Sequence, residues 1–388
     1  MAAAGCTMSL TAPLEVLFAE DIGYGPLLIV GFMLTSSFGV IVIDIFGTHC
    51  VPALDARLTL TAALALFGLA CIGMAVAWTV PIMMGVRLLQ GFGGGMMLGG
   101  GLQAAVRVPQ GPQGPRNPAR ALGRFNAAFL FGGAVGSPVG LIIAGVVHGV
   151  TGYRIAFGIT GTLALLIATG VLFTLPSLAA PAGFDRPRIG LPRFDKVPGT
   201  LSALLLAMVG DFLRGGVLFT ALPLAGAARG FPILGIGVAI GLMSFVEIVM
   251  LTVAYRLLAR LGLAGLLLSA LGLGLACATV LAVDESPLAY LAVSALFGCV
   301  LAGTTIGLPL VVVGLVGDSS AGLARFRISA GLGMLAGSAG CATLGTAVGA
   351  APLFWVVTAV LLGGLALAYD LGRILHVAEP VQDVRRVV

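Results

Sequence analysis

The sequence predicts an all-α membrane protein with twelve transmembrane helices in two pseudo-symmetric six-helix bundles. Of its 388 residues, 59% are hydrophobic and 9% are charged, whereas roughly a quarter of the residues of a soluble protein are charged. The 59 glycines agree with this class, because small residues let membrane helices approach one another closely. The apolar runs are continuous rather than alternating, so a porin-type barrel is excluded.

Loop signals divide the chain into twelve apolar segments, each of roughly the length that crosses a bilayer. The expected spans are 2–18, 26–48, 58–78, 80–105, 122–147, 153–175, 199–223, 232–254, 262–282, 287–312, 326–347 and 351–372. The first span is short at its N-terminal side, so the native start could lie upstream of Met1.

The basic residues of the loops predict the orientation, because cytoplasmic loops carry an excess of arginine and lysine. On one side lie Arg57, Arg107, Arg116, Arg120, Arg124, Arg186, Arg188, Arg193, Lys196, Arg256, Arg260, Arg325, Arg327, Arg373, Arg385 and Arg386. The opposite loops carry Glu20, Asp21, Asp284 and Glu285, with only Arg154 and Arg229 as basic residues. We therefore expect a multi-pass protein of the inner (plasma) membrane with both termini in the cytoplasm.

A long polar stretch divides six spans from six. Residues 176–198 are rich in proline and charge and predict a cytoplasmic linker. It separates an N-terminal bundle (1–175) from a C-terminal bundle (199–375), which is followed by a cytoplasmic tail (376–388). Two halves related by a repeat place a binding site between them, near the bilayer midplane.

Several function classes are not supported. The net charge of +5 is spread over short loops, so no nucleic-acid partner is expected. The only lysine, Lys196, is followed by Val197 and Pro198, so the chain has no Walker-type loop for ATP. The six cysteines and three histidines lack the spacing of a metal site or a catalytic triad. We expect no enzyme activity, no cofactor and no metal, and a monomer whose partners are a small-molecule substrate, protons and the lipid bilayer.

One arginine, Arg87, lies inside an apolar segment of membrane-spanning length. Its guanidinium stays charged in a protein, and burying such a charge in a bilayer costs ~2.5 kcal/mol or more. It is either a structural arginine that binds carbonyls of a neighbouring helix or a fixed charge that influences the protonation of a nearby carboxylate. Glu15, in the first span, is the expected partner in this half.

Three further charged residues lie within predicted spans of the second half. Asp211 and Arg214 are three residues apart and share a helix face, so they can pair with each other. Their pair either has no further role or breaks during a transport cycle. Glu247 has no charged residue within a helical turn, so it is either a proton carrier or a neutral acid bonded to another helix. Asp44, near the cytoplasmic end of the second span, is expected to contact a loop.

The fourth span carries Arg87, two variable residues, Gln90 and Gly91, followed by Gly93, Gly94 and Gly95. With the twelve spans, this pattern resembles the major facilitator superfamily of secondary transporters, and in particular its drug/proton antiporters. The resemblance covers nearly the whole chain. It implies that Arg87, with Gln90 beside it, influences the proton-binding step.

Two further segments resemble family motifs with a gating role. In the loop after the second span, Asp55 matches the family pattern and Arg57 is slightly displaced. The resemblance implies a latch between Asp55 and Arg325 or Arg327, although an ordinary solvated loop pair is equally compatible. The fifth span carries Gly132, Gly133, Gly136, Ser137, Pro138 and Gly140, similar to a glycine and proline motif of antiporters, and so favours export over uptake.

Together these features favour a secondary transporter that exports a small, partly apolar molecule by alternating access coupled to proton influx. Protonation of Glu15, Asp211 or Glu247 from outside would favour one orientation. Release inside, with Arg87 and Arg214 nearby, would favour the other. The alternatives are nutrient uptake by a symporter or uniporter, and a transporter-like membrane receptor or scaffold that binds a ligand without moving it.

Overall fold

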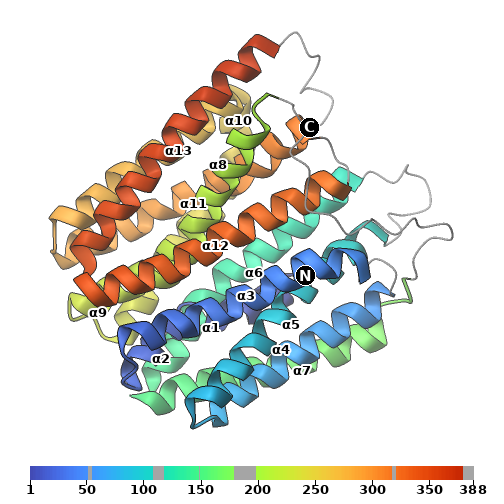
Figure 1. Cartoon of the computed structure of the whole chain (residues 1–388), viewed down its shortest axis with the longest axis vertical. Helices are drawn as coiled ribbons and strands as arrows, with labels where there is room; N and C mark the ends of the chain where they lie inside the picture. Colours follow the sequence, from blue (N-terminus) through green and yellow to red (C-terminus); the bar gives the residue numbers. More distant parts are fainter. Residues whose placement is uncertain (51–54, 108–117, 148, 179–197, 317–319, 379–388) are drawn as a thin grey trace.

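A computed structural model of the chain describes residues 1–50, 55–107, 118–147, 149–178, 198–316 and 320–378. Within these ranges every regular element is helical, which confirms the predicted fold class (Figure 1). In chain order the elements are α1 (Ala2–Thr11), α2 (Leu14–Asp21), α3 (Pro26–Cys50), α4 (Ala56–Val76), α5 (Val80–Arg107), α6 (Pro118–Val146), α7 (Val150–Thr174), α8 (Thr200–Phe212), the π-helix η2 (Leu213–Ala221), α9 (Leu222–Ala228), α10 (Ile233–Val283), α11 (Pro287–Val316), α12 (Ser320–Val348) and α13 (Ala350–Ala378).

In the described chain, eleven helical segments are long and apolar enough to cross a membrane. Two of them, Ile233–Val253 and Arg256–Val283, belong to α10, in which the chain turns at Gly262. The φ of Gly262 is 69°, a conformation that suits glycine. The helix α5 is outside this set because its glycines, Arg87 and Gln90 lower its hydropathy, yet its 28 residues extend about 42 Å. With α5, the twelve predicted spans are present.

The helices form two groups, with α1 to α7 on one side and α8 to α13 on the other (Figure 1). Between the groups, α3 packs against α12 and α6 packs against α10, while α2 contacts α9 and η2. The main cluster of buried apolar side chains extends through both groups, from Leu14 of α2 to Leu371 of α13. Most of the predicted linker (176–198) and of the tail (376–388) lies outside the described residues.

The first helix of each half is interrupted near its middle. The sequence predicts single spans at 2–18 and 199–223, and the structure divides both. At Pro13 the ring removes a backbone N–H donor, and α1 gives way to α2. In the second half α8 continues as the π-helix η2, where the Thr220 hydroxyl donates to the Gly215 carbonyl oxygen at 3.0 Å. π-Helical turns are rare and frequently lie at functional sites.

Glycines of α6 form a close seam with α1. A Cβ added at Gly132 or Gly140 would lie 1.8 Å from a carbonyl oxygen of α1, and one at Gly136 would lie 2.2 Å from that of Cys6. The four-residue spacing places the three glycines on one helix face, the small-residue arrangement that lets membrane helices touch. These residues of the predicted antiporter motif therefore join two helices of one bundle.

Pro138 faces the other bundle. A Cβ added at Gly241 of α10 would lie 3.3 Å from the Pro138 Cβ, and one at Gly237 would lie 3.1 Å from the Leu141 Cβ. The predicted gating residue Pro138 thus lies at the contact between α6 and α10. This contact lies near the start of α10, which the loop charges predict to be on the side of the membrane opposite the cytoplasm.

The seam predicts that Gly136→Ala lowers the stability of the protein, because the added Cβ collides with the backbone of α1. Overpacking of this kind costs about 1–3 kcal/mol. Thermal unfolding in detergent should show a lower midpoint for this variant. The matched control is Gly85→Ala in α5, where an added Cβ meets nothing within 4 Å. Equal midpoints for both variants would contradict the seam.

Candidate functional site

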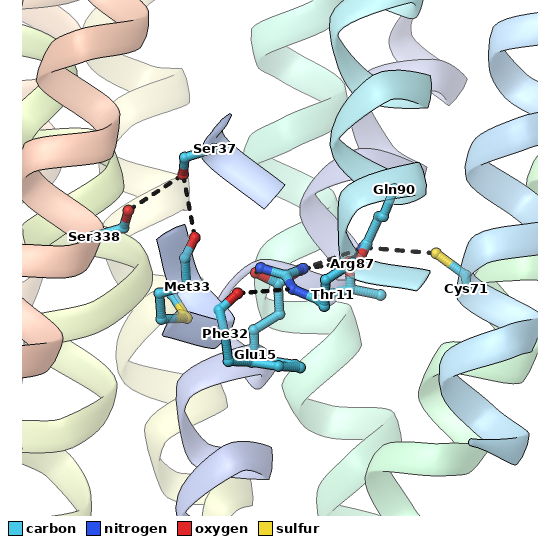
Figure 2. Close-up of polar contacts among 9 residues, drawn as sticks. All are labelled: Thr11, Glu15, Phe32, Met33, Ser37, Cys71, Arg87, Gln90 and Ser338. Carbon is cyan, nitrogen blue, oxygen red and sulfur yellow. Dashed lines mark hydrogen bonds and ion pairs between the residues drawn. The ribbon is translucent and has the colours of Figure 1, made fainter. Parts of the chain in front are cut away.

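Arg87 and Glu15 form the predicted ion pair. Both terminal nitrogens of the guanidinium contact the carboxylate, with Arg87 Nη2 at 2.8 Å from Glu15 Oε2 and Nη1 bonded to Oε1 (Figure 2). Arg87 is 1% exposed and Glu15 is 8% exposed. A two-pronged pair of this kind is among the strongest charge-assisted contacts in proteins. It joins α5 to α2.

Gln90 completes this contact from one helical turn away. Its side-chain oxygen accepts a hydrogen bond from Arg87 Nη1 at 2.8 Å. Its amide nitrogen donates to Thr11 Oγ1 at 3.1 Å and to Glu15 Oε1 at 3.3 Å. Since Thr11 ends α1 and Glu15 lies in the first turn of α2, the break at Pro13 lies between two partners of Gln90. We call Glu15, Arg87 and Gln90 the N-terminal charge group.

A third helix contributes an aromatic residue that the sequence did not reveal. Arg87 Nε donates to the carbonyl oxygen of Phe32 in α3 at 3.4 Å, and the guanidinium carbon lies 4.7 Å from the centre of the Phe32 ring (Figure 2). A cation over an aromatic face is attracted by the ring. Arg87 therefore has both kinds of partner that the sequence left open, a backbone carbonyl and a carboxylate.

In the second half Arg214 pairs with Glu247. Arg214 Nη2 lies 2.6 Å from Glu247 Oε1 and donates to the Thr305 hydroxyl at 3.0 Å, which links η2 to α10 and α11. The contact with Glu247 takes the place of the expected pair between Asp211 and Arg214, and Glu247 is bonded to another helix, as one of its two alternatives has it. Glu247 lies 33 residues from Arg214 in the sequence, on another helix, so no local pattern predicts this contact.

Asp211 is a second acid beside this pair. It is half-buried and close enough to Arg214 for their charges to interact. Within the described ranges it has no hydrogen bond and no ion pair. We call Asp211, Arg214 and Glu247 the C-terminal charge group. It contains two carboxylates and one guanidinium.

The two charge groups occupy comparable places in the two halves. Glu15 lies thirteen residues after Ala2, the first residue of α1, and Arg214 lies fourteen residues after Thr200, the first residue of α8. Each lies directly after the interruption of its helix, at Pro13 or at the start of η2. The charge at this place is negative in the first half and positive in the second.

An ion pair connects the two halves on the predicted cytoplasmic side. Arg327 of α12 contacts Asp44 of α3, which is 5% exposed. The hydroxyls of Ser37 and Ser338, on the same two helices, lie 3.4 Å apart (Figure 2). The expectation that Asp44 contacts a loop was wrong. Contact between α3 and α12 brings Asp44 to another helix.

Asp55 contacts the start of α4 and the chain after α7, so its latch to Arg325 or Arg327 stays a prediction. Asp55 caps the start of α4 by accepting from the Arg57 backbone N–H at 2.8 Å, and it accepts from the Leu178 N–H at 3.1 Å and from the Ser177 hydroxyl. These donors, led by Ser177, hold the pKa of Asp55 below its usual range. Asp55 therefore fixes the chain that follows α7, while Arg325 lies half-buried in α12.

Metal ligation has no support in the described ranges, which contain no group of three or more His, Cys, Asp or Glu that could hold an ion. The two charge groups contain carboxylates, guanidiniums and the amide of Gln90, with hydroxyls bonded beside them. Such groups bind and release protons and hydrogen-bond to a ligand.

The N-terminal charge group predicts an asymmetry between single and double substitutions. Arg87→Met leaves Glu15 buried without a cation and should cost about 3–5 kcal/mol. The double variant Glu15→Gln with Arg87→Met should lose less, because no unpaired charge remains. Thermal unfolding in detergent measures both, with Arg373→Gln as an exposed control. A double variant less stable than Arg87→Met would contradict the pairing.

The contact between Asp44 and Arg327 predicts that Asp44→Asn or Arg327→Gln shifts the protein toward an arrangement in which the predicted cytoplasmic ends of the two bundles are separated. A hydrogen bond to a charged group contributes about 1.5–3 kcal/mol, so the shift should be roughly tenfold or more. Spin labels on the exposed positions Leu58 and Leu261 report the distance between the bundles. Exchanging the two charges should restore the original distribution of distances between the labels. A distribution that neither single substitution changes would contradict the role of the Asp44–Arg327 pair in holding the bundles together.

Comparisons with known proteins agree with this architecture. A profile described as "Major Facilitator Superfamily" matches residues 1–324. A point mutant of the nucleoside transporter NupG has a similar structure (TM-score 0.73, 12% identity, 95% of this chain and 98% of that chain). So does the human organic anion transporter MFSD10 (TM-score 0.66, 16% identity, 95% and 97%).

A bacterial homologue of the human lysosomal transporter Spinster, in an inward-facing and occupied conformation, is also similar (TM-score 0.68, 11% identity, 96% of this chain and 94% of that chain). No curated protein matches the sequence. At these identities the solved structures support the fold alone. The family profile covers most of the sequence, and the chain therefore belongs to the Major Facilitator Superfamily.

Proposed function

We propose that this chain is a proton-coupled secondary transporter that exports a small, partly apolar molecule by alternating access between its two bundles. The observation that carries the proposal is that the C-terminal charge group has two carboxylates for one guanidinium, so that it contains one surplus carboxylate. Family membership supports a small-molecule substrate and a membrane location. Proton coupling and direction are the further steps that we infer.

Charge balance distinguishes the two charge groups. The N-terminal group has one carboxylate and one guanidinium, joined by two contacts, and is neutral. The C-terminal group has one negative charge too many if both acids are ionised, because arginine does not lose its proton. An uncompensated charge is expensive to remove from water. We therefore infer that one of the two acids holds a proton when no substrate is bound.

Asp211 is the acid we assign to this proton. Glu247 is 1% exposed and bonded to Arg214, whereas Asp211 is half-buried and forms no hydrogen bond or ion pair among the described residues. Loss of the proton from Asp211 creates a second anion that competes with Glu247 for Arg214. Protonation and release thereby change the contacts among η2, α10 and α11.

Proton release must be linked to rearrangement of the bundles. The Asp44–Arg327 pair on the predicted cytoplasmic side and the Ser37–Ser338 contact near the middle of the spans hold the halves together. On the opposite side α6 and α10 meet around Pro138. Alternating access would separate these two sets of contacts in turn. The π-helical η2 supports this view, since its rare hydrogen bonding lies directly beside Arg214.

Export rather than uptake is supported by the resemblance of the α6 glycines and Pro138 to the antiporter motif. A symporter could use the same acid with proton and substrate moving together. Cells that express the chain should accumulate less of an exported compound than cells without it. Higher accumulation would instead support uptake, and binding without any flux would support a receptor or scaffold.

The assignment of the proton to Asp211 predicts that Asp211→Asn abolishes transport driven by a pH gradient, at least a tenfold loss, and leaves substrate binding measurable. The neutral Arg214–Glu247 pair remains, so the variant should fold. The assay is a screen of radiolabelled compounds in inverted vesicles with and without an imposed pH gradient. Asp370→Asn is the matched control, because Asp370 bonds to Ser202 away from the charge group. Unchanged gradient-driven flux in Asp211→Asn would exclude this assignment.

A further inference from the structure

A groove of about 360 Å³ runs along one helix at the predicted cytoplasmic side. The described residues that line it are Met250, Val253, Arg256, Leu257 and Arg260, and these belong to α10. Positions 250, 253, 257 and 260 recur every three or four residues and therefore share one face of the helix. The lining changes along the helix axis from apolar residues to two arginines.

The length of the groove along the helix axis matches the thickness of one leaflet of a bilayer. Ten residues separate Met250 from Arg260, which is about 15 Å of helix. This is half of the roughly 30 Å hydrocarbon core of a membrane. Arg260 lies two residues before the turn at Gly262, while Met250 lies in the span Ile233–Val253. The arginines thus lie at the level of lipid headgroups and Met250 at the level of acyl chains.

Among the described residues, no acid forms a contact with Arg256 or Arg260. Arg256 and Arg260 are exposed, and in the part of the chain that the structure describes neither forms a hydrogen bond or an ion pair. The sequence has no acid between Glu247 and Asp284. On α13, which packs against α10, Asp370 bonds to Ser202. An anion from outside the chain would supply the missing charge.

We propose that the groove binds an anionic phospholipid of the inner leaflet, with its phosphate between Arg256 and Arg260. Its acyl chain lies along Leu257, Val253 and Met250. Two guanidiniums match the oxygens of a phosphate, and each can bind with two N–H groups. The apolar floor distinguishes a lipid from a free phosphate ion, which would gain nothing from Met250 and Val253.

The test uses the full chain in detergent, titrated with phosphatidylglycerol or with phosphatidylcholine of the same acyl chains. Native mass spectrometry measures the occupancy of the tightest lipid. Each arginine near an anionic lipid contributes about fivefold in affinity, so the double variant Arg256→Gln with Arg260→Gln should bind phosphatidylglycerol about 25-fold more weakly. The control Arg373→Gln, at an exposed arginine of the same side, should bind like the wild type.

Two further measurements distinguish the contribution of the headgroup to binding from that of the acyl chain. Inorganic phosphate at equal concentration should not displace phosphatidylglycerol, and Leu257→Ser should weaken lipid binding while both charges remain. Thermal unfolding checks that each variant is folded, and lysine at both positions should retain much of the preference. Equal affinity for the two lipids, equal loss in Arg373→Gln, or full displacement by inorganic phosphate would overturn the proposal.

Discussion

Two arginines that cannot lose their charge within membrane-spanning helices determine how the helices around them are placed. Arg87 contacts a carboxylate of α2, a backbone carbonyl and an aromatic ring of α3, and a side-chain amide of its own helix. Arg214 draws a carboxylate from α10 and a hydroxyl from α11. Lipid offers no partner for such charges in its interior, so each bundle supplies them from its own helices.

Close packing and local irregularity make these contacts possible. The glycines of α6 let α1 approach to backbone contact, which holds Thr11 near Gln90. The interruptions at Pro13 and at η2 lie immediately before Glu15 and Arg214. The irregular helix segments thus lie directly beside the charged side chains of both groups.

Part of this arrangement could be predicted from the sequence. Hydropathy and loop charge gave the helical class and the spans, and the cost of a buried arginine led to Glu15 as the partner of Arg87. The pairing of Arg214 with Glu247 could not be found, because it joins two helices whose packing no local pattern encodes. The contact between Asp44 and Arg327 depends on how the two bundles pack, which no local pattern encodes. Asp55 is a residue type that commonly caps helices, but a cap requires the helix to begin at Ala56, and the predicted span begins only at residue 58.

The most direct test of the surplus carboxylate is infrared spectroscopy of the substrate-free protein at neutral pH, since protonated and ionised carboxyl groups absorb at different frequencies. One protonated carboxyl in the membrane interior is expected in the wild type. Its band should disappear in Asp211→Asn, where one acid and one arginine remain balanced. It should persist in Asp370→Asn. Absence of the band in the wild type, or its persistence in Asp211→Asn, would contradict the assignment of a proton to the C-terminal charge group.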